Sequence, residues 1–266
     1  MLHFVIPLGS RQGSGNWPRV CQLLEHTLRS ACSQLHSECA ALVTCHDKPE
    51  GIHVPDNCRI VQVPFAAPAL SANDDLGTDA ALFAMHSDKG RKLIYGLQLV
   101  RSVADSYVMF LDADDLVSNR LAAHVAAHAG QNGWFIDRGY MMKSGSRWVY
   151  PRRRFYEECG SAYILRSDLA PFPEPPDYGK DLNDYYIRRY VVHAYVGDNM
   201  REAGHPLEPL PFYGAVYVRS GINMYATRFR RQDSPWRTVA RWLVKGRRVT
   251  PAIRAEFGIR EEGRRA

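Results

Sequence analysis

An apolar segment, Tyr107–Leu111, leads directly into the acidic sequence Asp112-Ala113-Asp114-Asp115. Such a segment is typical of a strand buried in a sheet, so the acids are expected where that strand ends. Because side chains alternate along an extended chain, Asp112 and Asp114 should lie on the same side. Two carboxylates there repel each other unless a cation or a proton lies between them. A divalent ion such as Mg²⁺ or Mn²⁺ prefers oxygen ligands of this kind. A simpler interpretation is that Asp114 or Asp115 caps the helix that follows.

Short apolar segments alternate with helical segments before these acids. Strands are predicted over His3–Ile6, Ala40–Cys45 and Arg59–Val63. Helices are predicted after Asn16 and over Leu93–Ala104, where apolar residues recur at helical spacing. This alternation is typical of an α/β fold with a mostly parallel sheet covered on both faces. Ligands of such sheets bind beyond the carboxyl ends of the strands.

The pattern is less regular after the acids. The predicted elements there are helices over Leu121–Ala129 and Asp184–Glu202, and strands over Trp134–Ile136, Tyr140–Met142, Ala162–Leu165 and Ala215–Val218. His124 and His128 are one helical turn apart, a spacing that occurs in zinc sites. No glutamate follows His124, although the metalloprotease pattern requires one. The two histidines are therefore expected on the polar face of a helix.

Positive charge is concentrated in the last part of the chain. The 266 residues carry a formal charge of +6, and 45% of them are hydrophobic, as in an ordinary globular protein. Residues 228–266 contain 12 Lys and Arg against 4 Asp and Glu, whereas residues 1–227 contain 22 against 24. We therefore expect a catalytic domain over 1–227 and a basic extension over 228–266. A charge confined to the extension argues against a nucleic-acid-binding groove.

The extension also has an amphipathic pattern. Trp236, Val239, Ala240 and Leu243 fall on one face of a predicted helix, with basic residues around them. Residues 228–248 could therefore contact an anionic membrane surface, or the helix could pack on the catalytic domain with its basic rim in solvent. No apolar stretch reaches 18 residues and the first residues lack a signal-peptide pattern. The six cysteines are irregularly spaced, which indicates reduced thiols. We expect a cytoplasmic protein, with possible association at the cytoplasmic face of a membrane.

The segment Val108–Asp115 resembles the D-x-D strand of GT-A glycosyltransferases, particularly the family 2-like enzymes. Other segments resemble the same family in order along the chain. These segments are Val5–Leu8, Val43–Asp47, Lys89–Lys92 and Cys159–Ala162. The similarity covers about residues 2–225, and the D-x-D segment is its specific part. The resemblance implies a GT-A-like nucleotide-diphospho-sugar transferase fold, with a mixed, mostly parallel sheet and helices on both faces.

The resemblance also implies a substrate and a set of site residues. The donor would be a nucleoside-diphosphate sugar, most often a UDP-sugar, and the acceptor a glycan or a lipid-linked glycan. Asp112 and Asp114 would hold Mn²⁺ or Mg²⁺. Residues implied in donor binding are Pro7, Leu8, Asp47, Arg91, Lys92 and Asp112. A divalent ion and nearby cations would stabilise the departing diphosphate. Arg91 and Lys92 could equally be solvated charges on the outer face of a helix.

An inverting enzyme of this family needs a carboxylate that takes the proton of the acceptor hydroxyl. The family usually supplies it at the start of a late helix, which points to Asp181 and Asp184. The usual Glu-Asp pair is absent from this chain, and either aspartate could instead cap the helix. His193 lies further along that helix; it could serve as a base or a metal ligand, but a histidine with apolar neighbours is expected to be packed and hydrogen-bonded.

The main alternative is a haloacid-dehalogenase-like phosphatase that uses Mg²⁺. Asp112 would then be the nucleophile and Asp114 the acid/base, with Gly197-Asp198 as the later metal motif and Lys180 as the lysine between them. About 105 residues of α/β pattern precede Asp112, however, whereas that nucleophile lies near the start of its domain. The expected helix would also place Asp198 on a helical face. A sugar nucleotidyltransferase is a weaker alternative, because the glycines of residues 9–15 are spaced differently from its phosphate loop.

Overall fold

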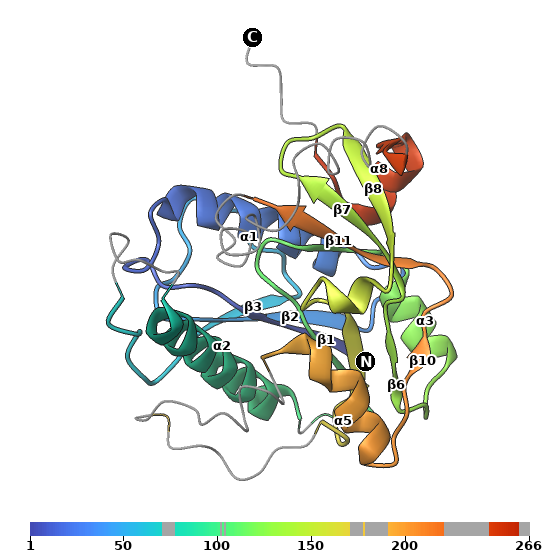
Figure 1. The fold of residues 1–266 in the computed structure, drawn as a ribbon, viewed down its shortest axis with the longest axis horizontal. Coiled ribbons are helices and arrows are strands. Elements are labelled where there is room, and N and C mark those ends of the chain that lie inside the picture. The colour runs from blue at the N-terminus through green and yellow to red at the C-terminus, as the bar shows by residue number, and fades with distance from the viewer. Residues whose placement is uncertain are drawn as a thin grey trace.

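The computed structural model describes residues 1–70, 78–101, 103, 105–170, 178, 191–220 and 245–260. Within these ranges the chain forms two sheets with helices packed around them (Figure 1). The larger sheet holds the core of the molecule, and the smaller one lies across its end with a second, separate core cluster.

The larger sheet has the strand order β10-β6-β9-β4-β1-β2-β3. Its strands are β1 Leu2–Pro7, β2 Cys39–Cys45, β3 Cys58–Gln62, β4 Tyr107–Phe110, β6 Gly133–Phe135, β9 Tyr163–Arg166 and β10 Glu208–Pro209. Strands β3, β2, β1 and β4 run parallel to one another, and β9 is antiparallel to both β4 and β6. Helices lie above and below this sheet in Figure 1. The α/β class with a mixed, mostly parallel sheet and helices on both faces is therefore confirmed.

Helices α1 Trp17–Cys32 and α2 Asp79–Val100 cover the two faces of the parallel strands (Figure 1). Each helix begins at a side-chain cap, because Asn16 accepts from the backbone N–H of Arg19 and Thr78 accepts from that of Ala81. A Cβ at Gly96 of α2 would lie 2.5 Å from Val5 Cγ1, so glycine allows α2 to approach β1 closely. α2 begins at Asp79, well before the predicted start at Leu93, and ends at Val100, so it is longer than the predicted helix.

The smaller sheet has the order β12-β8-β7-β11-β5. Its strands are β5 Leu116–Val117, β7 Arg138–Lys143, β8 Trp148–Arg153, β11 Tyr213–Arg219 and β12 Arg247–Arg248. Helix α8, Pro251–Phe257, packs Phe257 into the core cluster of this sheet with Val149, Val216 and Val218. Strand β8 was not predicted. Arg247 and Arg248 were expected beside a helix and instead form the edge strand β12, which pairs with β8.

The remaining elements are α3 Leu121–Ala127, η1 Phe155–Glu157, η2 His193–Tyr195 and α5 Val196–Glu202. The continuous helix expected over Asp184–Glu202 is wrong for its described part, because Val192 has an extended backbone and α5 begins only at Val196. Residues 184–190 and most of the predicted amphipathic segment lie outside the described residues. In the described part of the chain, no helix is both long and apolar enough to cross a membrane.

The two histidines of α3 do not form a purely polar face. The His124 ring packs edge-on against Trp134 and Phe212, with centroid distances of 5.2 and 5.5 Å. His128 is exposed, and its ring lies 4.2 Å from that of His124. His124 therefore belongs to an aromatic cluster under α3, whereas His128 lies at its exposed edge.

Candidate functional site

The acidic segment lies at the carboxyl edge of the larger sheet, immediately after β4. The Leu111 N–H donates to the carbonyl of Val5 at 3.0 Å, which extends the pairing of β4 with β1 by one residue. The Asp115 N–H then donates to the carbonyl of Asp112 at 3.1 Å and closes a turn. Extended-chain alternation was therefore the wrong reason for expecting Asp112 and Asp114 together. The turn brings them together instead.

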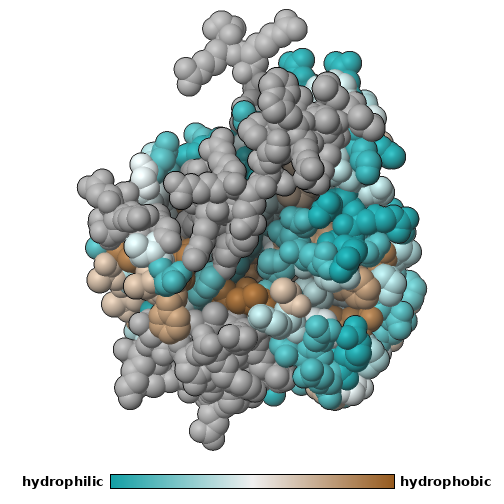
Figure 2. Space-filling view, viewed as in Figure 1, coloured by the Kyte–Doolittle hydropathy of each residue, from teal (hydrophilic) through white to brown (hydrophobic). Residues whose placement is uncertain are grey.

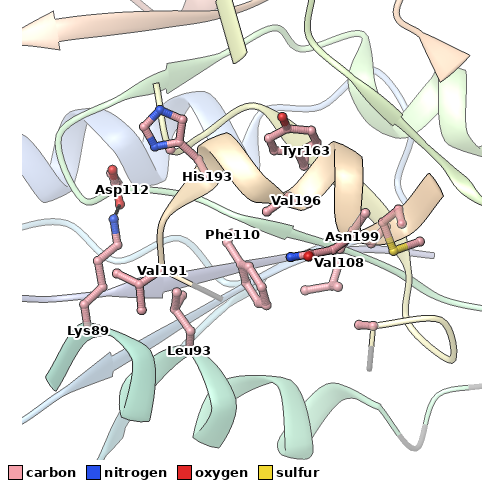
Figure 3. A pocket seen from close by; sticks show the side chains of 14 residues that line it. Lys89, Leu93, Val108, Phe110, Asp112, Tyr163, Val191, His193, Val196 and Asn199 are labelled. Carbon is pink, nitrogen blue, oxygen red and sulfur yellow. Dashed lines mark ion pairs between the residues drawn. The ribbon is translucent and has the colours of Figure 1, made fainter. Parts of the chain in front are cut away.

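Asp112 is at the mouth of a cavity. Its carboxylate is 27% exposed, and its Oδ1 lies 2.5 Å from the Nζ of Lys89, which reaches it from α2 (Figure 3). A Cβ at Gly160 would lie 3.0 Å from Asp112 Oδ2, so a residue without a side chain faces this carboxylate. The Asp112 backbone N–H donates to Ser161 Oγ at 2.9 Å, which fixes the start of the turn.

Asp114 is close enough to Asp112 for their charges to interact. Burial, followed by the negative charge of Asp112, raises the pKa of Asp114 to about 7. Ser220 at the end of β11 donates its hydroxyl to Asp114 Oδ2 at 3.1 Å. The two carboxyls thus form a repelling pair that a cation between them would relieve.

Asp115 serves a different purpose from the other two acids. It is fully buried and accepts hydrogen bonds from Ser161 Oγ at 2.7 Å, Cys159 Sγ at 3.1 Å and the Val218 N–H at 3.1 Å. Burial, with the charges of Asp114 and Asp112, raises its pKa well above the usual range. Asp115 therefore ties β4, the loop before β9 and β11 together beneath the site.

Neither Asp114 nor Asp115 caps the following helix. Helix α3 begins after Arg120, which makes no side-chain capping hydrogen bond. The simpler interpretation, that one of these acids caps the helix, is therefore wrong. Asp112 and Asp114 need another explanation.

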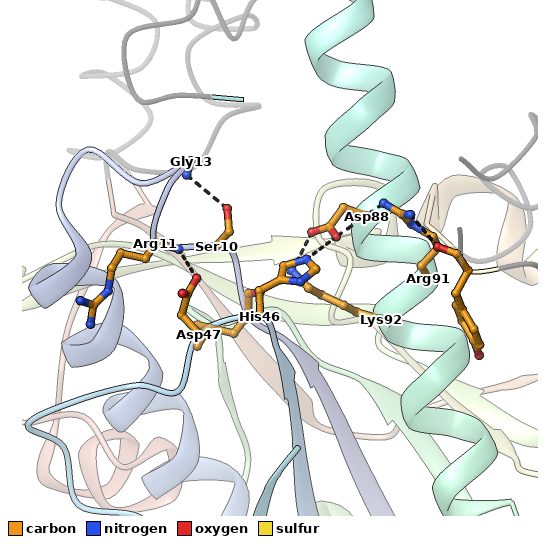
Figure 4. Close-up of polar contacts among 10 residues, drawn as sticks. Ser10, Arg11, Gly13, His46, Asp47, Asp88, Arg91 and Lys92 are labelled. Carbon is orange, nitrogen blue, oxygen red and sulfur yellow. Dashed lines mark hydrogen bonds and ion pairs between the residues drawn. The ribbon is translucent and has the colours of Figure 1, made fainter. Parts of the chain in front are cut away.

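The positive residues of α2 divide into separate environments. Lys92 is 1% exposed, and its Nζ lies 2.6 Å from Asp88 Oδ2 and 2.7 Å from the carbonyl of Leu8 (Figure 4). Arg91 is also buried and donates to the carbonyl of Tyr178 at 3.0 Å, with its guanidinium 4.8 Å from the Phe65 ring. Neither is a solvated charge on an outer face. Of the cations in this segment, Lys89 is the one that reaches an acid of the strand end.

His46 and Asp88 form a buried pair beside Lys92 that the sequence did not reveal. His46 Nε2 lies 2.7 Å from Asp88 Oδ1 (Figure 4). Burial alone would raise the pKa of Asp88, but the hydrogen bond of His46 and the ammonium of Lys92 lower it overall. The sequence contained one sign of this cluster, because Asp88 and Lys92 are four residues apart and could form an ion pair on a helix. Through Leu8, this cluster anchors the end of β1.

The remaining residues expected to bind a donor lie along the same edge of the sheet. Pro7 ends β1 and is half-buried, and the buried Leu8 donates its N–H to the carbonyl of Thr44 at 2.9 Å. Asp47, just beyond β2, accepts from the Arg11 N–H at 2.8 Å (Figure 4). Asp47 therefore holds the loop after β1 against the end of β2.

The proposed catalytic bases, Asp181 and Asp184, lie outside the described residues. His193 is described, and it lines the cavity with Asp112 and Lys89 (Figure 3). Burial lowers its pKa, and its Nε2 lies 3.1 Å from the carbonyl of Glu157. Because a carbonyl only accepts, Nε2 carries the proton and Nδ1 the lone pair.

Apolar side chains form most of the remaining cavity wall, between α2, the sheet and α5, together with Tyr163 and Asn199 (Figure 3). They include Leu93, Phe110, Leu165, Val191, Val196 and Met200. The surface view in Figure 2 shows apolar residues gathered near the middle of this face. The site thus combines charged groups at the mouth with an apolar interior.

The described residues contain no cluster of three or more His, Cys, Asp or Glu side chains arranged to hold a metal. The pair formed by Asp112 and Asp114 nevertheless suits a hard divalent ion, because both offer carboxylate oxygens and Asp112 already attracts a cation, Lys89.

The geometry predicts a pH dependence of stability in the metal-free protein. The pKa of Asp114 is about 7 in the folded chain, against about 3.9 in an unfolded chain. Between these values only the folded protein keeps the proton, so the free energy of unfolding should fall as pH rises from about 4 to about 7, by at least about 1 kcal/mol. Urea unfolding in the presence of a chelator measures this slope. Asp114→Asn should reduce it, and an unchanged slope would contradict the assignment.

Comparison with known proteins gives no sequence match and only low similarity to solved structures. No family model matches the chain, and no curated protein matches its sequence. A crystal structure of S. aureus TarS, residues 1–349, has 13% identity and a TM-score of 0.44, and the match covers 92% of this chain and 66% of that one. The structure of HddC from Yersinia pseudotuberculosis has 10% identity and a TM-score of 0.31, with 87% and 98% covered. The function assigned below therefore depends on the site itself.

Proposed function

We propose that this chain is a GT-A-like glycosyltransferase that moves a sugar from a nucleoside-diphosphate sugar to an acceptor hydroxyl. The observation that carries the proposal is the pair of neighbouring acids, Asp112 and Asp114, at the carboxyl edge of the parallel strands, with Asp112 at the mouth of a cavity. Ligands of such sheets bind at this edge. Carboxylates there suit a site for Mn²⁺ or Mg²⁺ together with a diphosphate.

In this proposal each residue around the site has a separate role. Asp112 and Asp114 would hold the divalent ion, which when bound stabilises negative charge on the departing diphosphate. Lys89 places a positive charge beside Asp112, which favours phosphate oxygens at the same place. The loop held by Asp47 and the end of β1 at Pro7 and Leu8 would contact the nucleotide, for which uridine is the first candidate. Lys92 and Arg91 would support these contacts from beneath, because both side chains are buried.

The acceptor hydroxyl would lose its proton to a carboxylate near Asp181 or Asp184, with inversion at the sugar carbon. His193 is a further polar group at the cavity mouth, and its unprotonated Nδ1 could accept a hydrogen bond from the acceptor.

The phosphatase alternative receives no support from the site. Asp198 lies on the surface of α5, is 65% exposed and pairs with Arg201 at 2.6 Å, as the helical prediction required. A metal-binding aspartate of that class would have to lie beside Asp112.

Turnover of donor sugars tests the proposal directly. The purified protein is mixed with UDP-, GDP- and dTDP-sugars, with Mn²⁺ or with a chelator, and release of the nucleoside diphosphate is measured. We expect release from one donor class, and only with the divalent ion. Release of inorganic phosphate from phosphomonoesters, with no donor turned over, would contradict the proposal.

Gly160 provides a test of the geometry at Asp112. In Gly160→Ala the new methyl group would lie 3.0 Å from Asp112 Oδ2 and 3.6 Å from Lys89 Nζ. Asp112 must then move, and we expect Mn²⁺ affinity to fall about tenfold, as it does when residues that orient metal ligands are changed. Gly9→Ala is the matched control, because a Cβ there meets nothing within 4 Å. Equal Mn²⁺ affinity of the two variants, measured by titration, would count against the assignment.

A further inference from the structure

One end of the smaller sheet carries a row of exposed side chains from four neighbouring strands. Arg248 of β12 pairs in register with Trp148 of β8, and Arg219 of β11 pairs with Lys143 of β7. Met142 pairs with Val149, so the residues next to them, Lys143 and Trp148, are also neighbours. Residues directly opposite each other share a face of the sheet. We name these four residues, Arg219, Lys143, Trp148 and Arg248, the cationic row.

The cationic row is accessible and positively charged. All four residues are exposed, and Trp148 is 52% exposed. Within the described ranges, no ion pair joins Arg219, Lys143 or Arg248 to an acidic residue. The arginines at the other end of β8 differ, because Arg152 pairs with Glu158 and Arg154 with Glu157. Among the residues that the structure describes, the sheet therefore pairs its arginines with acids at one end and not at the other.

Further positive charge surrounds the same end of the sheet. Arg147, Lys245 and Arg247 are all exposed. The Val249 N–H donates to the carbonyl of Arg147 at 2.8 Å, which holds the strand carrying Arg247 and Arg248 against β8. The row itself thus joins two parts of the chain about 100 residues apart, whereas Arg247 is opposite the core residue Val149 and takes the alternate position of its strand. In Figure 2 the described residues at the end where Figure 1 places β7, β8 and α8 are mostly hydrophilic.

The cationic row begins next to the candidate active site. Arg219 is followed by Ser220, which hydrogen-bonds to Asp114, and Val218 donates to Asp115. From Arg219 the row crosses three strand spacings to the sheet edge at Arg248, a span of about 14 Å. A chain lying along it would begin one residue along the backbone from the contact between Ser220 and Asp114.

We propose that the cationic row binds an anionic glycan chain, one that carries phosphate or carboxylate groups along its length. The three cations match the repeated negative charge of such a chain. Trp148 provides a flat apolar face against which a sugar ring can pack. That this chain is also the acceptor rests on the function proposed above; its binding does not.

A membrane surface suits the cationic row less well. Interfacial membrane binding requires several apolar side chains that enter the lipid together with the basic residues. Among the described residues of the smaller sheet, Trp148 is the one large apolar side chain that is exposed. A single indole within a group of cations suits a polar polymer better.

Binding of labelled polymers tests the inference. The probes are fluorescein-labelled polygalacturonate, inorganic polyphosphate and neutral dextran, with vesicles of anionic phosphatidylglycerol as a fourth ligand. The triple variant Lys143→Glu, Arg219→Glu and Arg248→Glu should bind both anionic polymers at least about tenfold more weakly than the unaltered protein. Trp148→Ala should weaken the binding of polygalacturonate but not of polyphosphate, which has no sugar rings.

The matched control is Arg59→Glu, which reverses an exposed arginine on edge strand β3 of the other sheet and should leave binding unchanged. Thermal unfolding checks that each variant is folded. Equal polymer binding by the triple variant, equal binding of dextran, or binding to vesicles alone would overturn the inference. Asp114→Asn should still bind polygalacturonate, so a failure of the proposed transfer reaction would be distinguishable from a failure of the row.

Discussion

Asp114→Asn is expected to lower the rate of nucleotide release from the donor sugar at least about 100-fold. The substitution keeps the shape of the side chain and its contact with Ser220 but removes the negative charge that would hold the divalent ion. Loss of several kcal/mol of charge stabilisation in the transition state gives a rate effect of this size. Steady-state measurement of nucleoside-diphosphate release with Mn²⁺ provides the value.

Asp198→Asn is the control for this prediction. Asp198 is an exposed aspartate of α5 whose described partner is Arg201, and its replacement should change the rate less than twofold. The two variants also separate the proposed enzyme from a phosphatase of the haloacid-dehalogenase type, which would need Asp198 as a metal ligand. Because the phosphatase would also need Asp114 as its acid/base, the Asp198 variant is the one that discriminates, and a damaging Asp198→Asn would contradict our assignment.

Gly133→Ala is expected to destabilise the fold by about 4 kcal/mol. Gly133 begins β6 with φ at +138°, a backbone conformation that residues with a Cβ rarely adopt. A Cβ there would lie 2.1 Å from the carbonyl oxygen of Ile164 in β9, and a backbone atom of a central strand cannot move away easily. Strand β9 follows directly from the loop that carries Cys159 and Ser161, so its displacement would also disturb Asp115.

Gly204→Ala is the control that separates the cost of a positive φ from the cost of the steric clash with the Ile164 carbonyl oxygen. Gly204 also has a positive φ, +79°, but a Cβ there meets nothing within 4 Å. We expect a cost of about 1 kcal/mol, from backbone strain alone. Chemical denaturation compares the two free energies of unfolding, and similar values for both variants would show that β6 and β9 are not packed as described.

The sequence predicted the parallel strands because their apolar segments are continuous and end at clear loops. The same reasoning located Asp112 and Asp114, since both follow the strongest such segment. It gave a wrong reason for their proximity, because a turn closed by a backbone hydrogen bond leaves no hydrophobic pattern. It also missed β8, in which Pro151, Arg152 and Arg153 conceal the strand pattern.

Contacts between distant segments were beyond the reach of sequence patterns. Asp115 appeared equivalent to its neighbours, yet its partners Cys159, Ser161 and Val218 come from two later parts of the chain. Lys89 could not be distinguished from Arg91 and Lys92 until the rotation of α2 against the sheet was known. The cationic row depends on strand register between β8 and β12, which charge counting along the chain cannot provide.

The most direct test of the account is a thermal-shift titration of UDP with and without Mn²⁺. If Asp112 and Asp114 hold a divalent ion against a diphosphate, UDP and Mn²⁺ together should raise Tm by several degrees, while either one alone raises it little. A shift of this size is expected when the ligand concentration is about 100 times its Kd. Asp112→Asn and Asp114→Asn should each abolish this joint shift. An equal shift in those variants, or no joint shift in the unaltered protein with any nucleoside diphosphate, would contradict the assignment of the site.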